Sequence, residues 1–251
     1  MYIPTVEGII ARRLLINYRV DSATLQQMLP APFRPKLIHG MGIAGICLIR
    51  LKDIRPRGLP AQVGFTSENA AHRVAVEWDE HGVHHREGVY IPRRDTSSRF
   101  NTLIGGRLFP GVHHLARFQV AEADGTFAVD MASDDGETRV AVEARLAPDL
   151  PERSIFASLE EASAFFEHGA LGYSDTNQPG ILDTLELRCK RWRVEPLQVT
   201  RVQSTFFDDQ KRFPPGSAEL DCALLMRAIP HEWYVREPFS LLESERWRRA
   251  S

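Results

Sequence analysis

Alternation of apolar and polar side chains predicts a meander of three strands in the middle of the chain. Between residues 138 and 146, Val140, Val142 and Ala144 occupy every second position, which is the spacing of a strand with one buried face. Two similar segments, residues 114–122 and 126–133, precede it, and Asp-Gly turns at residues 124–125 and 135–136 join the three. Asp-Gly between apolar runs is a strong hairpin signal, so antiparallel pairing is expected.

Most of the remaining chain also predicts strands. Segments rich in branched apolar residues lie at residues 9–20, 41–51, 74–78, 88–91, 185–190, 197–207 and 218–229. Only short segments have apolar residues at helical spacing. Two of them follow the N-cap candidates Asp21 and Ser158, and residues 241–247 are a third candidate helix. Many strands, few short helices and no strand-helix-strand rhythm predict a mainly β fold. We expect an antiparallel sheet system or barrel in a single domain spanning residues 1–251.

The charge balance excludes some classes of partner. The chain has 251 residues, a formal net charge of −2 and a pI of about 6.5, so no overall field attracts nucleic acid or anionic lipid. No apolar run approaches the roughly 18 residues of a transmembrane helix. Residues 1–7 lack the basic-then-apolar layout of a signal peptide. We therefore expect no nucleic-acid partner, no membrane and a cytoplasmic location.

The sequence contains no recognisable motif for a cofactor or a metal. Its three cysteines are far apart, and Cys47 lies in an apolar run where a buried structural thiol is expected. His113 and His114 are adjacent at the start of a predicted strand, so their side chains would face opposite ways. No zinc, phosphate-loop or dinucleotide-binding spacing occurs. We expect neither a metal nor a cofactor.

The most informative segment is Arg-Glu-Gly-Val-Tyr-Ile-Pro-Arg-Arg at residues 86–94. It resembles, without a gap, the signature of the acetoacetate decarboxylase family, in which Arg-Glu is followed after four residues by Pro-Lys-Lys. Residues 18–32 resemble that family's strand-helix opening and its Pro-x-Pro turn. Residues 88–99 and 105–114 are closer still to an uncharacterised bacterial branch of the same superfamily. The resemblance implies an antiparallel β-barrel with a few short helices, an internal pocket, a bacterial source and assembly into homo-oligomers.

The two arginines that end this segment change the expected chemistry. In acetoacetate decarboxylases the first lysine of the pair forms a Schiff base with the substrate ketone, and the second lowers its pKa. These lysines correspond to Arg93 and Arg94, and a guanidinium stays protonated and cannot be that nucleophile. A displaced Schiff-base lysine stays open as an alternative, since four lysines lie outside the signature: Lys36, Lys52, Lys190 and Lys211. We expect chemistry without a Schiff base.

Paired guanidiniums are suited to holding an anion. Their planar forks match carboxylate, phosphate or enolate oxygens, and two buried cations need an anion nearby. One interpretation places Arg93 and Arg94 in the pocket as catalytic residues for a small organic acid or keto acid. The alternative is that they face opposite sides of one strand, with one in the pocket and the other in a surface ion pair.

Further polar residues complete the candidate site. Glu87 and Glu68 are candidates for moving a proton in catalysis. Arg13 is a candidate for binding the substrate, because the family has an arginine near residue 12 or 13 of the first strand. Further candidates for substrate binding come from the signature and from the loop after it: Tyr90, Ser97 and Arg99.

Three functions fit these residues. The first is a lyase-type enzyme (a decarboxylase or dehydratase), or a hydrolase that opens a lactone, in which arginine holds a carboxylate or stabilises an enolate while a glutamate moves a proton. The second is a non-catalytic protein that binds or senses an organic acid. The third is a barrel filled with side chains and without a ligand. An acid or base beside the pocket arginine favours the enzyme, and a cavity without one favours binding.

Overall fold

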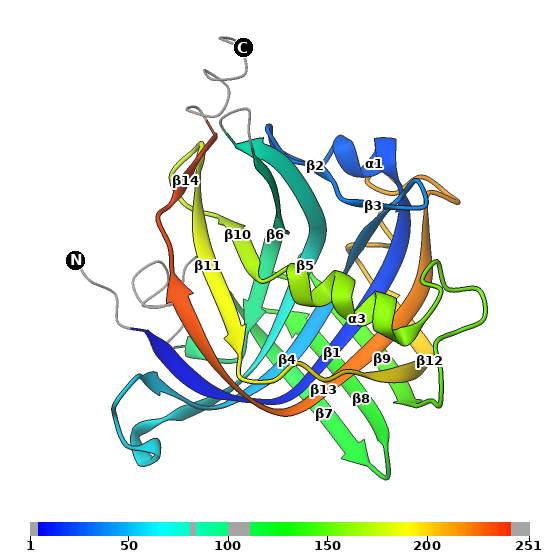
Figure 1. Cartoon of the computed structure of the whole chain (residues 1–251). Coiled ribbons are helices and arrows are strands. Elements are labelled where there is room, and N and C mark those ends of the chain that lie inside the picture. The colour runs from blue at the N-terminus through cyan, green and yellow to red at the C-terminus, as the bar shows by residue number, and fades with distance from the viewer. Residues whose placement is uncertain (1–4, 81–83, 100–110, 242–251) are drawn as a thin grey trace.

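The computed structural model describes residues 5–80, 84–99 and 111–241, and regular structure in this part of the chain is mostly β-strand (Figure 1). The strands are β1 (Val6–Asp21), β2 (Arg34–Pro35), β3 (Leu37–Ile38), β4 (Met41–Pro56), β5 (Phe65–Glu80), β6 (His84–Thr96), β7 (His114–Ala123), β8 (Thr126–Ser133), β9 (Arg139–Leu146), β10 (Leu171–Asp175), β11 (Ile181–Cys189), β12 (Glu195–Ser204), β13 (Ala218–Val235) and β14 (Phe239–Ser240). The helical elements are α1 (Ser22–Gln26), η1 (Ala61–Val63) and α3 (Leu159–His168). The predicted mainly β fold is confirmed.

Nine of the described strands close into a barrel. Their order is β6–β7–β8–β9–β12–β13–β1–β4–β5, and β5 returns to pair with β6. The pairings around this barrel are antiparallel, apart from the parallel pair β6–β7. A parallel neighbour needs a crossover connection of a dozen or more residues, and residues 97–113 separate these two strands. The barrel is as predicted, and the parallel pair is a departure from the predicted antiparallel pairing.

A second ring of strands adjoins the barrel. β13 pairs with β12 through residues 223–225 and with β11 through residues 231–235. β6 likewise pairs with β7 at residues 95–96 and, in parallel, with β10 at residues 89–91. Because β10 and β11 pair with each other, strands β13, β1, β4, β5, β6, β10 and β11 form a seven-stranded ring. Helix α3 lies across the strands that the two rings share (Figure 1).

The shared strands have a different environment on each face. Leu14 and Leu48 belong to the core of the nine-stranded barrel, together with Val129 from β8. The alternate position Leu15 belongs to a second cluster, together with Phe166 from α3. Successive residues of a strand face opposite sides, so the barrel is filled by side chains while the second ring is covered by the helix.

Helix α3 forms where the sequence predicts it. Ser158 Oγ accepts the backbone N–H of Glu161 at 3.2 Å, and the Glu161 carboxylate accepts the N–H of Ala157 at 2.6 Å. These bonds satisfy amides that have no partner within the first turn of the helix. Phe165 and Phe166 are buried on one side of the helix, and they pack α3 against the second ring.

Several strands extend beyond their predicted bounds. The predicted segments 74–78 and 88–91 are parts of β5 and β6, which begin at Phe65 and His84. Strand β10 was not predicted, because it is only five residues long and contains a glycine. The candidate helix at residues 241–247, apart from Leu241, lies outside the described residues, as does most of the 105–114 motif. No helix in the described residues is long and apolar enough to cross a membrane.

Candidate functional site

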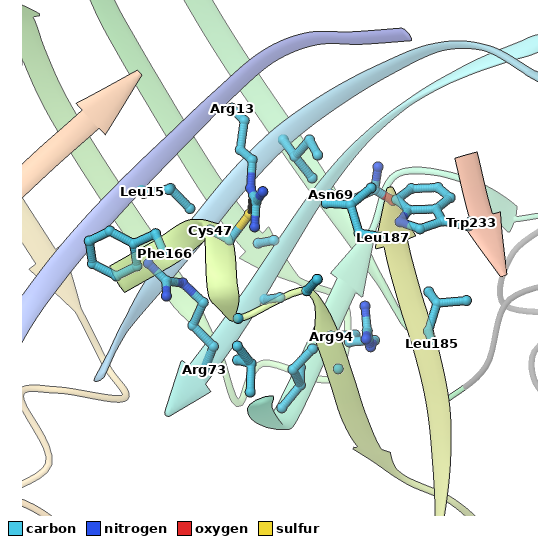
Figure 2. Close-up of a pocket in the computed structure, with 18 of the residues that line it drawn as sticks. Arg13, Leu15, Cys47, Asn69, Arg73, Arg94, Phe166, Leu185, Leu187 and Trp233 are labelled. Atoms are coloured by element: carbon cyan, nitrogen blue, oxygen red, sulfur yellow. Dashed lines mark hydrogen bonds between the residues drawn. The ribbon is translucent and has the colours of Figure 1, made fainter. Parts of the chain in front are cut away.

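A cavity of about 140 Å³ lies within the seven-stranded ring, beneath helix α3 (Figure 2). Each of the seven strands and α3 contribute residues to its wall. Much of that wall is apolar and includes Leu15, Phe166, Leu185, Leu187 and Trp233. Four cations and two carboxylates also line it: Arg13, Lys36, Arg73, Arg94, Glu87 and Asp95. The site is therefore apolar with an excess of positive charge.

Arg94 of the signature segment enters the cavity from β6 (Figure 2). Its Nε donates to Ser174 Oγ at 2.8 Å, and no carboxylate among the described residues forms an ion pair with it. Burial lowers the pKa of Arg94 to about 10, although Cys47 and Asp183 act in the opposite direction. Both Nη groups are without a hydrogen-bond partner in the described part of the chain, so this guanidinium can bind an anion.

A glycine allows the chain to approach Arg94 closely. Gly111 has a φ of 91°, which is favourable for glycine and strained for other residues. A Cβ at this position would lie 2.7 Å from Ser174 Cβ and 3.4 Å from Arg94 Nε. The Gly111 N–H donates to Asp183 Oδ2 at 2.7 Å, which holds the segment before β7 against the Arg94–Ser174 pair.

Arg93 lies on the other face of β6 and belongs to an ion-pair cluster. Its guanidinium lies 2.8 Å from Asp95 Oδ1, 2.7 Å from Asp135 Oδ2 and 3.2 Å from Glu137 Oε2. Burial alone would lower the pKa of Arg93, but its hydrogen bonds to Asp95 and Asp135 outweigh burial and raise it. The two alternatives for the arginine pair are thus decided: Arg94 lines the cavity, and Arg93 does not.

A bulge at Pro92 sets this arrangement. Tyr90 and Arg93 are three residues apart on β6, whereas their partners on β5, at positions 74 and 72, are two apart. Proline cannot donate to the ladder and is found in sheets at edges and bulges. The additional residue changes the alternation, so Ile91 and Arg94 both line the cavity, although strict alternation would place them on opposite faces.

Two more arginines enter the cavity from β1 and β5. Arg13 Nε donates to Cys47 Sγ at 3.2 Å, and its Nη1 lies 3.8 Å from Met226 Sδ. Arg73 is buried and donates to Asn17 Oδ1 at 2.5 Å. Within the described residues neither has a carboxylate partner. Arg13 was predicted to bind the substrate and does line the cavity, while Arg73 was not predicted.

Lys36 and Glu87 form an ion pair at the cavity wall. Lys36 Nζ lies 2.5 Å from Glu87 Oε2 and 4.5 Å from the centroid of the Phe165 ring. Burial raises the pKa of Glu87, but the hydrogen bond and the charge of Lys36 outweigh burial and hold it below its usual value. Glu87, predicted to move a proton, therefore lines the cavity as the ionised partner of a lysine.

His113 adds a basic nitrogen to the same wall. Its Nδ1–H donates to the Gly111 carbonyl oxygen at 3.1 Å, which leaves Nε2 as the unprotonated nitrogen. Burial, together with the charge of Arg94, lowers the pKa of His113 to about 4. The neighbouring His114 instead pairs with Asp135 at 3.0 Å. His113 is therefore neutral near pH 7 and can accept a proton.

Comparison with known protein families identifies the family of the chain. A family model described as an uncharacterised conserved protein, DUF2071, matches residues 10–227. The chain belongs to this family. No curated protein matches the chain.

Solved structures show what fold this DUF2071 chain has. An acetoacetate decarboxylase-like enzyme from Sphingomonas wittichii RW1 is 12% identical over 96% of this chain and 93% of its own, with a TM-score of 0.56. Acetoacetate decarboxylase from Legionella pneumophila is 13% identical over 93% and 88%, with a TM-score of 0.59. The enduracididine biosynthesis enzyme MppR, in complex with pyruvate, is 11% identical over 96% and 92%, with a TM-score of 0.60. The fold is therefore acetoacetate decarboxylase-like, as the signature predicts.

Four more of the predicted site residues in the DUF2071 chain lie outside the cavity. Glu68 forms an ion pair with buried Arg12 at 2.6 Å, and Tyr90 belongs to the core of the barrel. Ser97 Oγ accepts the N–H of Glu68 at 3.0 Å, and Arg99 is exposed. The position of Glu68 and Tyr90 outside the cavity has a simple cause. Their neighbours on the strand, residues 67 and 69 and residues 89 and 91, line the cavity. Alternation along the strand turns Glu68 and Tyr90 to the other face.

Three basic residues of the cavity were not predicted as site residues: Arg73, Lys36 and His113. Arg73 directly precedes the predicted strand 74–78, and continuing the alternation backwards from Ala75 would have placed it on the cavity face. Lys36 lies between the short strands β2 and β3, in a connection whose course no local pattern indicates. For His113, alternation separates it from His114 but does not indicate which of the two faces a cavity.

Proposed function

We propose that this protein binds a small organic acid in the cavity, with the carboxylate of the acid held by Arg94. The observation that carries the proposal is the guanidinium of Arg94, which is half-buried in the cavity wall without a carboxylate partner among the described residues. A charge buried in a protein is normally paired, and an acidic ligand would pair it. The complex of MppR with pyruvate, a small keto acid, supports this class of ligand on a protein of similar fold.

The size of the cavity and its lining fit such a ligand. Its volume of about 140 Å³ is close to the roughly 150 Å³ of an apolar cavity that holds benzene. Leu185, Leu187 and Phe166 would contact the carbon skeleton of the acid. Each charge-assisted hydrogen bond between Arg94 and the carboxylate would contribute about 1.5–3 kcal/mol.

Thermal-shift measurements with pyruvate, acetoacetate and short hydroxy acids test the proposal. The variants are Arg94→Met and, as a matched control, Arg145→Met, which changes an exposed arginine of β9. The wild type and Arg145→Met are expected to be stabilised by the same acids. Arg94→Met is expected to bind them about 10–100-fold more weakly, the equivalent of one or two charge-assisted hydrogen bonds. Equal stabilisation of Arg94→Met would remove Arg94 from the site.

A lyase-type activity is the second candidate, and His113 favours it. Its neutral imidazole lines the same cavity as Arg94. It would accept a proton from the carbon beside the carbonyl of a keto acid, while the guanidinium stabilises the developing enolate. With a pKa of about 4, His113 is a weak base in the empty cavity. A carboxylate bound next to it would raise that pKa towards the neutral range.

Proton exchange separates an enzyme from a binding protein. Methyl protons of pyruvate in D₂O are followed by NMR with the wild type and with His113→Asn. An enzyme would speed the exchange in the wild type and lose most of that rate in His113→Asn. If the wild type binds pyruvate and exchanges its protons no faster than the variant, the protein is a non-catalytic binding or sensing protein.

The proposed chemistry does not use a Schiff base, and Lys36 provides the test. Lys36 would need a free neutral amine to attack a ketone, whereas its Nζ is held in an ion pair with Glu87 at 2.5 Å. Borohydride treatment in the presence of acetoacetate, followed by mass spectrometry, is expected to give no covalent adduct. An adduct that forms on the wild type and disappears in Lys36→Gln would show that the displaced lysine has taken over the role.

Assembly into a homo-oligomer and a cytoplasmic location stay predictions from the sequence. Light scattering after size-exclusion chromatography measures the first, and a mass equal to that of the monomer would contradict it.

A further inference from the structure

A second cationic region, formed by Arg13 and Arg73, lies in the same cavity as Arg94. We propose that the ligand is a dicarboxylate, with one carboxylate on Arg94 and the other between Arg13 and Arg73. This inference rests on the proposed function, because it takes the carboxylate site at Arg94 as given. It adds the chemical class of the acid, which Arg94 alone does not specify.

Among the described residues, Arg13 has only sulfur atoms as hydrogen-bond partners. Its Nε donates to Cys47 Sγ at 3.2 Å, and its Nη1 lies 3.8 Å from Met226 Sδ. Thiol and thioether sulfurs are weak acceptors, and neither contact neutralises the guanidinium. Nη2 of Arg13 has no hydrogen-bond partner in the described part of the chain. The charge of Arg13 is therefore available to an anion in the cavity.

Arg73 is buried, with 6% of its surface exposed, and its direct contacts are with neutral groups. Its Nη2 donates to Asn17 Oδ1 at 2.5 Å, its guanidinium lies 4.9 Å from the centroid of the Phe166 ring, and its Nε has no partner among the described residues. Burial is the main cause that lowers the pKa of Arg73 to about 10, and Arg13 acts in the same direction. A carboxylate between the two guanidiniums would relieve both the burial and the repulsion.

The strand register separates this region from Arg94. Cys47, Ala71 and Arg94 are direct neighbours across β4, β5 and β6. Adjacent strands are about 4.8 Å apart, so the Cα atoms of Cys47 and Arg94 are roughly 10 Å apart. Arg13 reaches Cys47 from β1, and Arg73 lies beside Phe166, whereas Arg94 stands apart near Leu185 (Figure 2). The small side chain of Ala71 leaves the middle of the cavity open.

Apolar side chains make up much of the cavity wall. Leu185 and Leu187 of β11 and Phe166 of α3 line it, so the part of the ligand between its two carboxylates would be a carbon chain. With a cavity of about 140 Å³, that chain is short. Dicarboxylates of about four to six carbons match a space that is close to the roughly 150 Å³ known to hold benzene.

Matched pairs of acids test the inference. Succinate is compared with butyrate, glutarate with valerate and adipate with hexanoate by isothermal titration calorimetry. The proteins are the wild type, Arg13→Met, Arg73→Met and the exposed-arginine control Arg145→Met, each checked for folding by circular dichroism. The wild type and Arg145→Met are expected to bind a dicarboxylate at least about tenfold more tightly than its monocarboxylate counterpart. In Arg13→Met and Arg73→Met this ratio is expected to fall towards one.

The outcomes distinguish failure of this inference from failure of the proposed function. If monocarboxylates bind through Arg94 and dicarboxylates bind no more tightly, the ligand is not a dicarboxylate, and the organic-acid function stands. If the preference survives in both variants, the second carboxylate binds elsewhere and the inference is wrong. If the wild type binds neither class, the proposed function itself fails. Should Arg73→Met not fold, Arg13→Met decides alone, since its weak sulfur contacts contribute little to stability.

Discussion

Replacing Arg93 by methionine should destabilise the fold, whereas the same replacement at Arg94 should not. Arg93 donates to Asp95, which is 0% exposed, and to Asp135. Arg93→Met would leave the Asp95 carboxylate buried without its cation. Arg94 has only Ser174 as a hydrogen-bond partner in the described residues, so Arg94→Met would remove a half-buried charge that has no ion-pair partner there.

The geometry of the Arg93–Asp95 pair sets the size of the effect. Asp95 accepts three hydrogen bonds from Arg93, of 3.1, 3.2 and 2.8 Å. Removing one partner of a buried ion pair costs about 3–5 kcal/mol, and we expect about 3 kcal/mol because part of the cluster reaches solvent at Glu137. In a chain of this size that lowers Tm by about 6–12 °C. Arg94→Met loses one hydrogen bond worth about 1 kcal/mol, which relief of the buried charge offsets.

Urea unfolding followed by tryptophan fluorescence at pH 5 and pH 8 measures both variants. In the wild type, burial raises the pKa of Asp95 more than Arg93 lowers it, and without Arg93 the pKa should rise further. A carboxyl group whose folded pKa lies above its unfolded pKa stabilises the protein at low pH, and this contribution is lost as the pH rises through the folded pKa. The deficit of Arg93→Met should therefore be smaller at pH 5 than at pH 8.

Two results would refute this reasoning. Equal destabilisation by Arg93→Met and Arg94→Met would mean that Arg94 has a stabilising partner comparable to Asp95. A deficit of Arg93→Met that grows in acid would mean that the unpaired Asp95 is not the cause of the destabilisation.

Three further predictions concern single positions. Gly111→Ala should destabilise more than the control Gly136→Ala, by about 1–3 kcal/mol for an overpacked site. Both glycines have positive φ, so backbone strain is common to the two, but only Gly111 has close neighbours; equal urea midpoints would contradict this. His72→Phe should make the free energy of unfolding fall less steeply as the pH is lowered. The pKa of His72 is lowered to about 3 by burial, so below pH 6.5 the unfolded chain takes up a proton that the folded chain does not, costing about 1.4 kcal/mol per pH unit; an unchanged slope of stability against pH would show that another group is responsible. Ala71→Leu should block acid binding, as it places a larger side chain between the two cationic regions; binding with unchanged affinity would place the ligand elsewhere.

The fold could be predicted from the sequence because local pattern and signature agree. The alternation of Val140, Val142 and Ala144 and the Asp-Gly turns define strands β7 to β9 without reference to any other part of the chain. The capping residue Ser158 and the stripe that includes Phe165 do the same for α3. The second ring was not predicted, because it depends on β6 and β13 pairing with different strands along their lengths, which is a property of the assembled sheet.

The candidate site could be predicted only in part, because membership depends on which face a side chain occupies. Arg13 and Glu87 were predicted and line the cavity, whereas Glu68 and Tyr90 occupy the opposite face of strands that also line it. Both faces of the shared strands are buried, one in the barrel and one beneath α3. Alternating polarity therefore does not indicate which face contains a cavity.

Pro92 is the residue that makes the signature pair difficult to interpret from sequence. A regular strand would put residues 89, 91 and 93 on one face, and Val89 and Ile91 do line the cavity. Arg93 would then be expected to line it as well, in the position of the family's Schiff-base lysine. The bulge adds a residue at this point of β6 and moves Arg94 to the cavity face instead. Because Arg93 is consequently paired with Asp95 at 2.8 Å, the adjacent arginines differ in their partners, and the one without an ion-pair partner among the described residues is the one that lines the cavity.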